Sequence, residues 1–586
     1  METNPPTEVR GAARPPRLAV LLLLFVMPLT FATVGSVHGH GEGYVPDTHI
    51  VRNALGMAKE RNPVPEVGRY STYPNLLPYM LLPVYAGHFA VGMLSGEWEG
   101  SKEFGDHVLQ EPGGVHWLAR LVIALLSALA PWVVYRTALC AGLTRGALVS
   151  GWLVATCLLF AQFSTQERPW APMTMFIALT AWGAVAYGKS GRRKHLVASG
   201  MAAGLAFATH QAGLGALGIT GLAWLFGPRR WTGSDLIERL RSGVFAVAGF
   251  ALLGYLIGHP YLLVHGRTAT DAVVGGEQLV SDWSLSIGGM SIQFDIRPES
   301  AERLSGVLLG YDPMVLLLGL AGLALVLRNR ALAPVTIWTV GWGLFFLTAP
   351  SDHVRYLLPV LVLLALPAGF LAERMLRAKG TRIALAFAML LPLIQVARFA
   401  HLLSGQDTRA DVEAALYELP LGSRVAVDRY GPTTDLSLDA LTRLKEIRHL
   451  QGAGLYARER HRRNLLREGE LGFDDEGFDL VPIEDLFSFD ERKRTVAVRG
   501  GLEVNGSTPK EVFASLGVTH VLIVERRTQA AHLLGDLIEG REPVWSLDPG
   551  GDEPAPEAFL PLEMDFPLTA VWSVHRPGPR LRLFKL

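Results

Sequence analysis

The residues best suited to chemistry in this sequence are charged and histidine side chains that border long apolar segments. Asp47 is the first of them, since it lies ten residues beyond the apolar segment 17–37. The apolar spacing of residues 50–58 predicts a helix directly after Asp47, which could simply cap it. A carboxylate at a helix start is also held in place and kept ionised by the helix dipole. Asp47 is therefore a candidate general base, which would take a proton from an attacking hydroxyl group.

Three further charged residues lie at the ends of apolar segments, where charge is costly and tends to be functional. Glu167 and Arg168 precede a proline, and they could act on a substrate or form a local ion pair at a turn. Arg355 could bind a phosphate through two parallel hydrogen bonds, or extend to the membrane interface. The residues that we expect on one face of the membrane are Asp47, Glu167, Arg168, His210, His259, His265, Asp352, His353 and Arg355. Together they predict a site for a charged lipid headgroup.

Histidines near Asp47 raise the question of a metal ion. His38, His40 and Glu42 alternate in a glycine-rich segment, with His49 nearby, and could bind a divalent metal. Histidines two residues apart in such a segment more often belong to an ordinary loop. We therefore predict no metal ligands and no cofactor, and keep a divalent metal as the alternative.

Composition identifies the class of protein. The chain has 586 residues, is 49% hydrophobic and has a mean hydropathy of +0.27, which is typical of a membrane protein. Lys+Arg and Asp+Glu balance at 54 each, so the overall charge favours neither a nucleic acid nor a polyanionic partner. The two cysteines, Cys140 and Cys157, both lie in apolar segments, which excludes a disulfide framework and a cysteine-based zinc site.

Apolar segments predict a polytopic α-helical membrane domain, because a helix needs about 20 apolar residues to cross the hydrocarbon core. The eleven candidate spans are 17–37, 116–138, 147–163, 170–188, 196–209, 211–226, 243–264, 310–327, 331–349, 354–372 and 382–399. Residues 196–226 could instead form one long helix. The first span could be a cleaved signal peptide, but its length and the ten spans that follow favour a retained anchor.

Basic residues set the predicted topology, because short cytoplasmic loops are enriched in Lys and Arg. The basic clusters are Arg10/Arg14/Arg17, Arg136/Arg145, Lys189/Arg192/Arg193/Lys194, Arg229/Arg230, Arg328/Arg330 and Arg374/Arg377/Lys379/Arg382. All of them fall inside if the N-terminus is cytoplasmic and residues 196–226 cross twice. This places the loop 38–115 and the C-terminus outside the membrane. Within that loop, the apolar stretch 76–94 is read as a helix lying in the interface.

Three regions follow: a cytoplasmic tail 1–16, a transmembrane domain 17–400 with the outer loop 38–115, and an extracytoplasmic domain 401–586. The last region predicts an α/β domain large enough to bury its own core. It has a helical segment at 407–419, strands at 424–428 and 518–524, and a closing hairpin formed by 569–575 and 580–585.

The order of these motifs resembles that of the polytopic GT-C glycosyltransferases, most closely the family-39 group of protein O-mannosyltransferases and lipid A aminoarabinose transferases. The likeness covers residues 15–425. Its elements are 46–49 (Pro-Asp-Thr-His), 54–58, 73–79 (Tyr-Pro-Asn-Leu-Leu-Pro-Tyr), 119–122, 355–359 (Arg-Tyr-Leu-Leu-Pro) and 407–409 (Asp-Thr-Arg). The family usually has Asp-Glu where Asp47 is followed by Thr48, and a basic residue where Tyr73 stands, so that Arg69 or Arg52 would have to substitute.

The resemblance implies an inverting transfer of a sugar from a polyprenyl phosphate to a hydroxyl of an envelope glycan, lipid or protein. The reaction would take place on the outer face of a bacterial inner membrane. It implies Asp47 and Glu167 as catalytic residues. The substrate-binding residues would be Arg52, Arg69, Tyr73, Arg168, His353, Arg355 and Tyr356. Neither the sugar nor the acceptor is specified.

Two other functions stay open. A transporter or flippase would need charges midway along several helices and half-helices broken at matching positions, whereas the charges here gather at helix ends. A non-catalytic membrane protein could use the outer domain to bind an envelope polymer.

Overall fold

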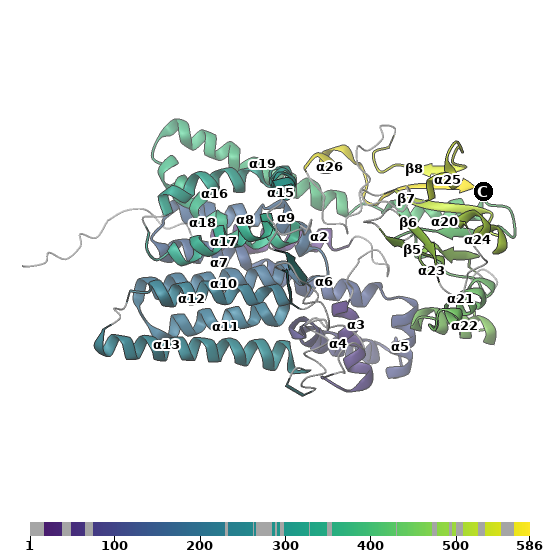
Figure 1. The fold of residues 1–586 in the computed structure, drawn as a ribbon, viewed down its shortest axis with the longest axis horizontal. Helices are drawn as coiled ribbons and strands as arrows, with labels where there is room; N and C mark the ends of the chain where they lie inside the picture. Colours follow the sequence, from purple (N-terminus) through teal and green to yellow (C-terminus); the bar gives the residue numbers. More distant parts are fainter. Residues whose placement is uncertain are drawn as a thin grey trace, which may run out of the picture. The chain divides into compact units, whose positions relative to one another are not determined.

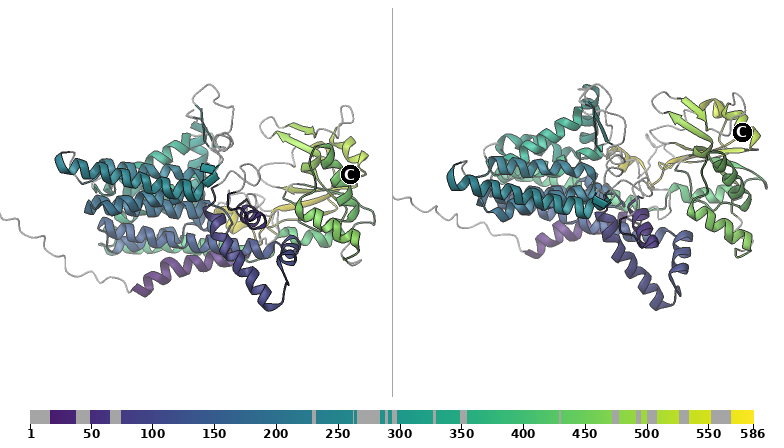
Figure 2. Two further views of the ribbon diagram at one scale, coloured as in Figure 1. Left: turned by 90° about the horizontal axis from the view of Figure 1, so that it is seen from below. Right: turned by 60° about the horizontal axis from the view of Figure 1, so that its bottom comes forward.

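The structure is a computed structural model, shown in Figures 1 and 2. It describes residues 17–37, 49–64, 74–228, 232–261, 263–264, 284–287, 290–293, 298–326, 329–348, 354–428, 430–471, 477–490, 495–499, 508–525, 534–551 and 568–586. Contacts divide the chain into two compact units. The first comprises Met1–Thr33, Arg52–Met80 and Val122–Ala397, and the second comprises Val34–Val51, Leu81–Leu121 and Arg398–Leu586.

Helices make up nearly all of the described chain up to residue 403. In chain order they are α1 (Arg17–Leu21), η1 (Leu22–Val26), α2 (Met27–Gly35), α3 (His49–Glu60), α4 (Leu76–Ser95), α5 (Ser101–Gln110), α6 (Gly113–Ser127), α7 (Leu129–Ala141), α8 (Arg145–Ala155), α9 (Leu158–Ser164), α10 (Trp170–Ser190), α11 (Arg193–Thr209), η2 (Gln211–Ala216), α12 (Leu217–Phe226), α13 (Gly233–Ala251), η3 (Leu252–Gly258), α15 (Pro298–Tyr311), α16 (Pro313–Val326), α17 (Ala333–Thr348), η4 (Val354–Leu357), α18 (Leu358–Met375) and α19 (Lys379–Leu403). Strands β1 (Ser284–Ile287) and β2 (Met290–Gln293) form a separate antiparallel pair.

The predicted spans are helical. By length and composition, seven described helices could cross a membrane, and α8 with α9 could form an eighth span, bent by 55°. The shorter apolar helices Gln211–Phe226, Pro313–Val326 and Ala333–Phe346 coincide with three further predictions, and α11 with another. The chain is therefore a multi-pass membrane protein. One of the seven long helices is α4, whose placement in the interface stays a prediction.

Residues 196–226 form two helices, as the charge pattern favours. The chain is extended at His210, which ends α11, and the ring Nδ1 of His210 accepts a hydrogen bond from the Ala212 N–H at 3.0 Å. After this turn α12 runs back along α11, because the hydroxyl oxygens of Ser199 and Thr220 lie 2.8 Å apart. Figure 1 shows α10, α11, α12 and α13 side by side.

Small residues let these helices approach closely. A Cβ added at Gly200 would lie 2.2 Å from the carbonyl oxygen of Ala246, and one at Gly204 would lie 2.6 Å from that of Phe250. Since real Cβ atoms do not approach so closely, the packing of α11 against α13 requires glycine at both positions.

The second unit contains a five-stranded sheet in the order β4-β3-β7-β9-β8. Its strands are β3 (Val425–Val427), β4 (Leu480–Pro482), β7 (His520–Glu525), β8 (Trp545–Leu547) and β9 (Arg580–Lys585). Strand β3 pairs in parallel with β4 and β7, whereas β9 is antiparallel to β7 and β8. A second pair, β5 (Phe487–Asp490) and β6 (Thr495–Val498), is antiparallel. The helices are η5 (Thr408–Asp411), α20 (Val412–Tyr417), α21 (Leu438–Leu450), α22 (Ala457–Glu468), α23 (Ile483–Leu486), α24 (Pro509–Ser515), α25 (Gly535–Ile538) and α26 (Leu568–Ser573).

The sheet is buried on both faces, which explains the unbroken apolar run in β7. Val521 and Ile523 belong to one buried cluster, whereas Leu522 and Val524 belong to another. The predicted α/β domain and its strands at 424–428 and 518–524 are confirmed.

The predicted closing hairpin is wrong. Residues 580–585 form β9, but this strand pairs with β7 and β8, and Leu568–Ser573 is helix α26. The reason is the spacing of its apolar residues: Ala570, Val571 and Val574 are all buried, at intervals that place them on one face of a helix.

The Asp407-Thr408-Arg409 motif fastens the C-terminal end of the chain. The guanidinium of Arg409 forms two 2.8 Å hydrogen bonds with both carboxylate oxygens of Asp407, and both side chains are buried. The Thr408 N–H and hydroxyl donate to the carbonyl oxygens of Pro577 and Pro579, at 2.9 and 2.8 Å. These contacts hold the start of the C-terminal domain against its last residues, which is a structural role.

Part of the loop 38–115 belongs to the second unit. Trp98 is fully buried, and its indole N–H donates to the carbonyl oxygen of Phe89 at 2.8 Å, which folds the chain after α4 back on that helix. Helix α5 then contacts α22, where Asp106 Oδ1 lies 3.5 Å from His461 Nδ1. This part of the loop is thereby attached to the C-terminal domain.

Candidate active site

The break between α8 and α9 determines where the first site residues lie. Residue Cys157 is extended between the two helices, and the carboxylate of the fully buried Asp312 caps the start of α9. The N–H groups of Leu158 and Leu159 donate to its two oxygens at 2.7 and 3.0 Å, and the Cys157 thiol lies 3.3 Å from one of them. Asp312 thus fixes a short helix that leads directly into the turn of Glu167 and Arg168.

Glu167 and Arg168 are almost inaccessible to solvent, at 0% and 1% exposure. The Arg168 N–H donates to the Gln166 carbonyl oxygen at 2.8 Å, which tightens the turn before α10 begins at Trp170. Both residues make further interactions within the structure. Burying charge without a partner is costly, and charged side chains buried at such a turn tend to be functional, so Glu167 and Arg168 remain candidate site residues.

Arg355 lies against the same end of α10. Its guanidinium carbon is 5.4 Å from the centre of the Trp170 ring and 5.7 Å from the centre of the Tyr356 ring. The Tyr356 ring stacks on Phe346 with centres 4.8 Å apart, which holds the Tyr356 ring in position beside Arg355. Within the described part of the chain, the buried Nε of Arg355 has no hydrogen-bond partner. Arg355 is therefore a candidate for binding an anionic ligand.

Two histidines complete the cluster. The His210 ring lies 4.3 Å from the Trp170 ring, between ring centres. His259 follows η3, whose last residue packs on α11, because a Cβ at Gly258 would lie 2.4 Å from the Ala208 Cα. The buried Nε2 of His259 has no hydrogen-bond partner among the described residues. We call Glu167, Arg168, His210, His259 and Arg355 the polar cluster.

The start of α4 is attached beside the polar cluster. The N–H of Asn75 donates to the carbonyl oxygen of Gly258 at 2.8 Å. The segment 73–79 was singled out from the sequence, and its described residues lie next to the histidine end of the cluster.

The structure brings together part of the predicted site. Glu167, Arg168, Arg355 and Tyr356 come together around Trp170, whereas Arg52 is exposed on α3. Other predicted residues lie outside the described part of the chain: Asp47, Arg69, Tyr73, His265, Asp352, His353 and the possible metal ligands His38, His40 and Glu42. Helix α3 begins at His49, two residues after Asp47, so the helix predicted there is present.

Sequence reasoning missed Trp170 and Asp312. A signal for Asp312 was available, because an aspartate before Pro313 at the start of an apolar helix is a frequent helix start. Its second role at the start of α9 could not be read from the sequence.

Chemically, the polar cluster is suited to a phosphate. A guanidinium held against aromatic rings loses little entropy on binding, and its planar donors match two phosphate oxygens. Arg168, two residues before Trp170, adds a second positive charge, and Glu167 is a carboxylate that can orient donors or accept a proton.

Comparison with known families identifies a related region. Residues 111–260 match the family model described as dolichyl-phosphate-mannose-protein mannosyltransferase. The match covers about a quarter of the chain, and it includes the four residues of the polar cluster other than Arg355. It confirms the predicted resemblance over these residues. A comparison with curated proteins finds no match.

Three solved structures of glycosyltransferases show some similarity to this chain. ArnT from Cupriavidus metallidurans bound to undecaprenyl phosphate is 16% identical, with a TM-score of 0.43, over 70% of this chain and 67% of that chain. The oligosaccharyltransferase AglB from Archaeoglobus fulgidus, in complex with an inhibitory peptide and a dolichol-phosphate, is 13% identical, with a TM-score of 0.39, over 85% and 69%. The arabinofuranosyltransferase AftD from Mycobacteria is 15% identical, with a TM-score of 0.45, over 98% and 40%. These similarities are too low to carry an argument about this chain.

Proposed function

We propose that the chain transfers a sugar from a polyprenyl-phosphate donor to a hydroxyl of an envelope glycan, lipid or protein on the outer face of a bacterial inner membrane. One observation carries the proposal. Arg355 lies against the rings of Trp170 and Tyr356 with a buried donor that no described residue satisfies, beside the buried Glu167–Arg168 turn that precedes Trp170. The description of the matching family model, which names a dolichyl-phosphate sugar donor, supports the same donor chemistry.

In the proposed reaction, the acceptor oxygen attacks the anomeric carbon as the bond between that carbon and the phosphate oxygen breaks. The electron pair of this bond goes to the phosphate, and the configuration of the sugar inverts. Arg355 and Arg168 would stabilise the leaving phosphate, since fixed donors act most strongly where charge develops. A divalent ion at His38, His40 and Glu42 would add to this charge rather than replace it.

The proton of the acceptor hydroxyl needs a base. Asp47 is our first candidate, because it precedes α3 by two residues and lies close to the end of the first span in sequence. Glu167 is the second candidate, although it is fully buried beside Arg168 and is better placed to orient that arginine. His353, Tyr73, Arg69 and Arg52 remain proposed donor-binding residues.

A lipid flippase is the second candidate function, and the broken helix α8–α9 favours it. Discontinuous helices line the binding sites of many transporters. Here the N–H groups exposed by the break donate to the carboxylate of Asp312, so they are not available to bind a substrate. We therefore rank transfer above transport.

The test is a transfer assay with the full chain in detergent and labelled polyprenyl-phosphate sugars of defined structure. Membrane fractions supply acceptors. We expect release of polyprenyl phosphate together with a labelled acceptor. The proposal fails if no donor is cleaved while the same protein in proteoliposomes moves the intact donor between leaflets.

A further inference from the structure

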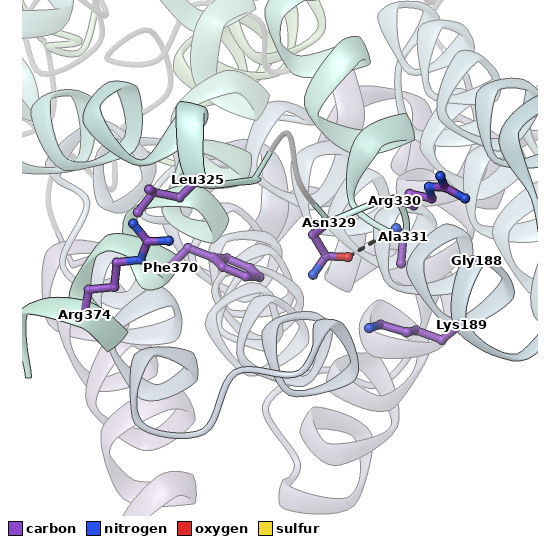
Figure 3. Close-up of a pocket in the computed structure, with 8 residues that line it drawn as sticks. All are labelled: Gly188, Lys189, Leu325, Asn329, Arg330, Ala331, Phe370 and Arg374. Carbon is purple, nitrogen blue, oxygen red and sulfur yellow. Dashed lines mark hydrogen bonds between the residues drawn. The ribbon is translucent and has the colours of Figure 1, made fainter. Parts of the chain in front are cut away.

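A cavity of about 540 Å³ lies at the other end of the helices that carry the polar cluster. Its lining combines three cations with apolar side chains: Lys189, Arg330, Arg374, Gly188, Leu325, Asn329, Ala331 and Phe370. No acidic residue is among these lining residues. We call it the basic pocket, and Figure 3 shows its side chains.

Three separate elements supply the cations. Lys189 lies in the last turn of α10, Arg374 lies in the last turn of α18, and Arg330 lies on the connection between α16 and α17. All three are exposed. Asn329 fixes the connection, because its side-chain amide donates to the Ala141 carbonyl oxygen at 3.0 Å and accepts from the Ala331 N–H at 3.2 Å. The charges therefore border a defined cavity.

The basic pocket is distinct from the candidate active site. Trp170 begins α10 and Lys189 lies 19 residues later, so a rise of about 1.5 Å per residue separates them by about 28 Å. Arg355 and Arg374 also lie 19 residues apart along η4 and α18. This separation is close to the thickness of the hydrocarbon core, about 30 Å. On the predicted topology, the pocket faces the cytoplasm.

We propose that the basic pocket binds the phosphate of an anionic glycerophospholipid, such as phosphatidylglycerol. Three cations without an acidic residue in the same lining are suited to bind an anion. They also lie at the ends of helices that could cross the membrane, which is the depth at which lipid headgroups are found. Figure 3 shows Phe370 between Arg374 and Asn329, and Leu325 beside Arg374. These apolar side chains would contact the glycerol and the start of an acyl chain, which free phosphate lacks.

Helix ends alone do not explain the charge. Lys189 and Arg374 also complement the negative ends of α10 and α18. Arg330 belongs to no helix, yet it lines the same cavity and adds positive charge that neither helix end requires.

The test measures lipid binding by native mass spectrometry of the full chain in detergent. Phosphatidylglycerol is titrated against phosphatidylcholine with the same acyl chains. One variant carries Lys189→Gln, Arg330→Gln and Arg374→Gln. The matched control carries Arg192→Gln, Lys194→Gln and Arg377→Gln, which removes equal charge from exposed residues that do not line the pocket.

We expect phosphatidylglycerol to bind more tightly than phosphatidylcholine. The pocket variant should bind phosphatidylglycerol about a hundredfold more weakly, because each cation contributes roughly fivefold near a charged lipid surface. The control variant should stay close to the unmodified protein. If the triple variant fails to fold, Arg330→Gln alone should still weaken binding by about fivefold.

Three results would overturn the proposal. Equal losses in both triple variants would mean that general surface charge attracts the lipid. Equal binding of the two lipids would mean that the headgroup is not recognised. Displacement of phosphatidylglycerol by millimolar inorganic phosphate would assign the pocket to free phosphate instead.

Discussion

Replacing Arg355 tests the proposed donor site most specifically. Arg355→Ala removes a guanidinium that lies against Trp170 and Tyr356 and carries a buried Nε without a partner in the described chain. A hydrogen bond to a charged group contributes about 1.5–3 kcal/mol, so donor affinity should fall by about 10- to 150-fold. The variant should fold normally, because no described side chain is hydrogen-bonded to the Nε atom that the substitution removes.

Arg355→Lys refines the test. Lysine keeps the positive charge but lacks the planar guanidinium that lies against the two rings. We expect an intermediate loss of affinity, with turnover at saturating donor closer to normal. Arg136→Ala is the matched control, because Arg136 also lies over an aromatic ring, that of Trp132 at 5.6 Å, but outside the polar cluster.

The assay is donor binding to the purified protein, measured with a labelled polyprenyl-phosphate sugar, together with transfer rates over a range of donor concentrations. Loss of affinity in Arg355→Ala with normal affinity in Arg136→Ala is the expected pattern. Unchanged donor affinity in Arg355→Ala would refute the assignment of Arg355 to the phosphate.

Three further predictions follow from other parts of the chain. Asp312→Ala should lower both turnover and the thermal unfolding midpoint, because it leaves two buried N–H groups of α9 without an acceptor, at about 1–3 kcal/mol each. Asp312→Asn should retain part of both, and an Ala variant equal to the unmodified protein would contradict the capping role. In the C-terminal domain, burial and then the charge of Lys585 lower the pKa of His520 below its usual 6.5, so the folded domain disfavours the protonated form. The stability that the domain owes to neutral His520 should be fully present above pH 6.5 and fall as the pH drops through that value. His520→Gln should reduce this pH dependence, which urea unfolding followed by pulse proteolysis would measure. A reporter active only outside the cytoplasm should be active after Leu586 and silent near Arg193, and the reverse pattern would contradict the topology.

The helices were predictable because their signal is local. A span requires about 20 apolar residues, and the two-pass reading of 196–226 needed only the charge pattern and a break at His210. The extended backbone of His210 confirms that break. By contrast, the segment after residue 568 is apolar but short, and its helical spacing was taken for a strand.

Contacts between distant residues were not predictable. Strand β9 pairs with β7, whose register no local pattern specifies, and α5 meets α22 through Asp106 and His461. The cap that Asp312 supplies to α9 joins residues 154 positions apart. The polar cluster was only partly predictable. The predicted topology placed its members on one face of the membrane, but the contacts of Arg355 depend on how the rings of Trp170 and Tyr356 pack.

The most direct test is the turnover of Asp47→Asn compared with that of Glu167→Gln, measured in the transfer assay at saturating donor. Asparagine keeps the shape of the side chain but cannot take the proton. General-base catalysis is worth about 10²–10⁴-fold, so we predict that Asp47→Asn loses turnover by at least about a hundredfold. Donor binding and protein level should change little in this variant. Glu167→Gln should lose less turnover than Asp47→Asn. Near-normal turnover in Asp47→Asn together with its abolition in Glu167→Gln would show that Glu167 is the base and would contradict the role assigned to Asp47.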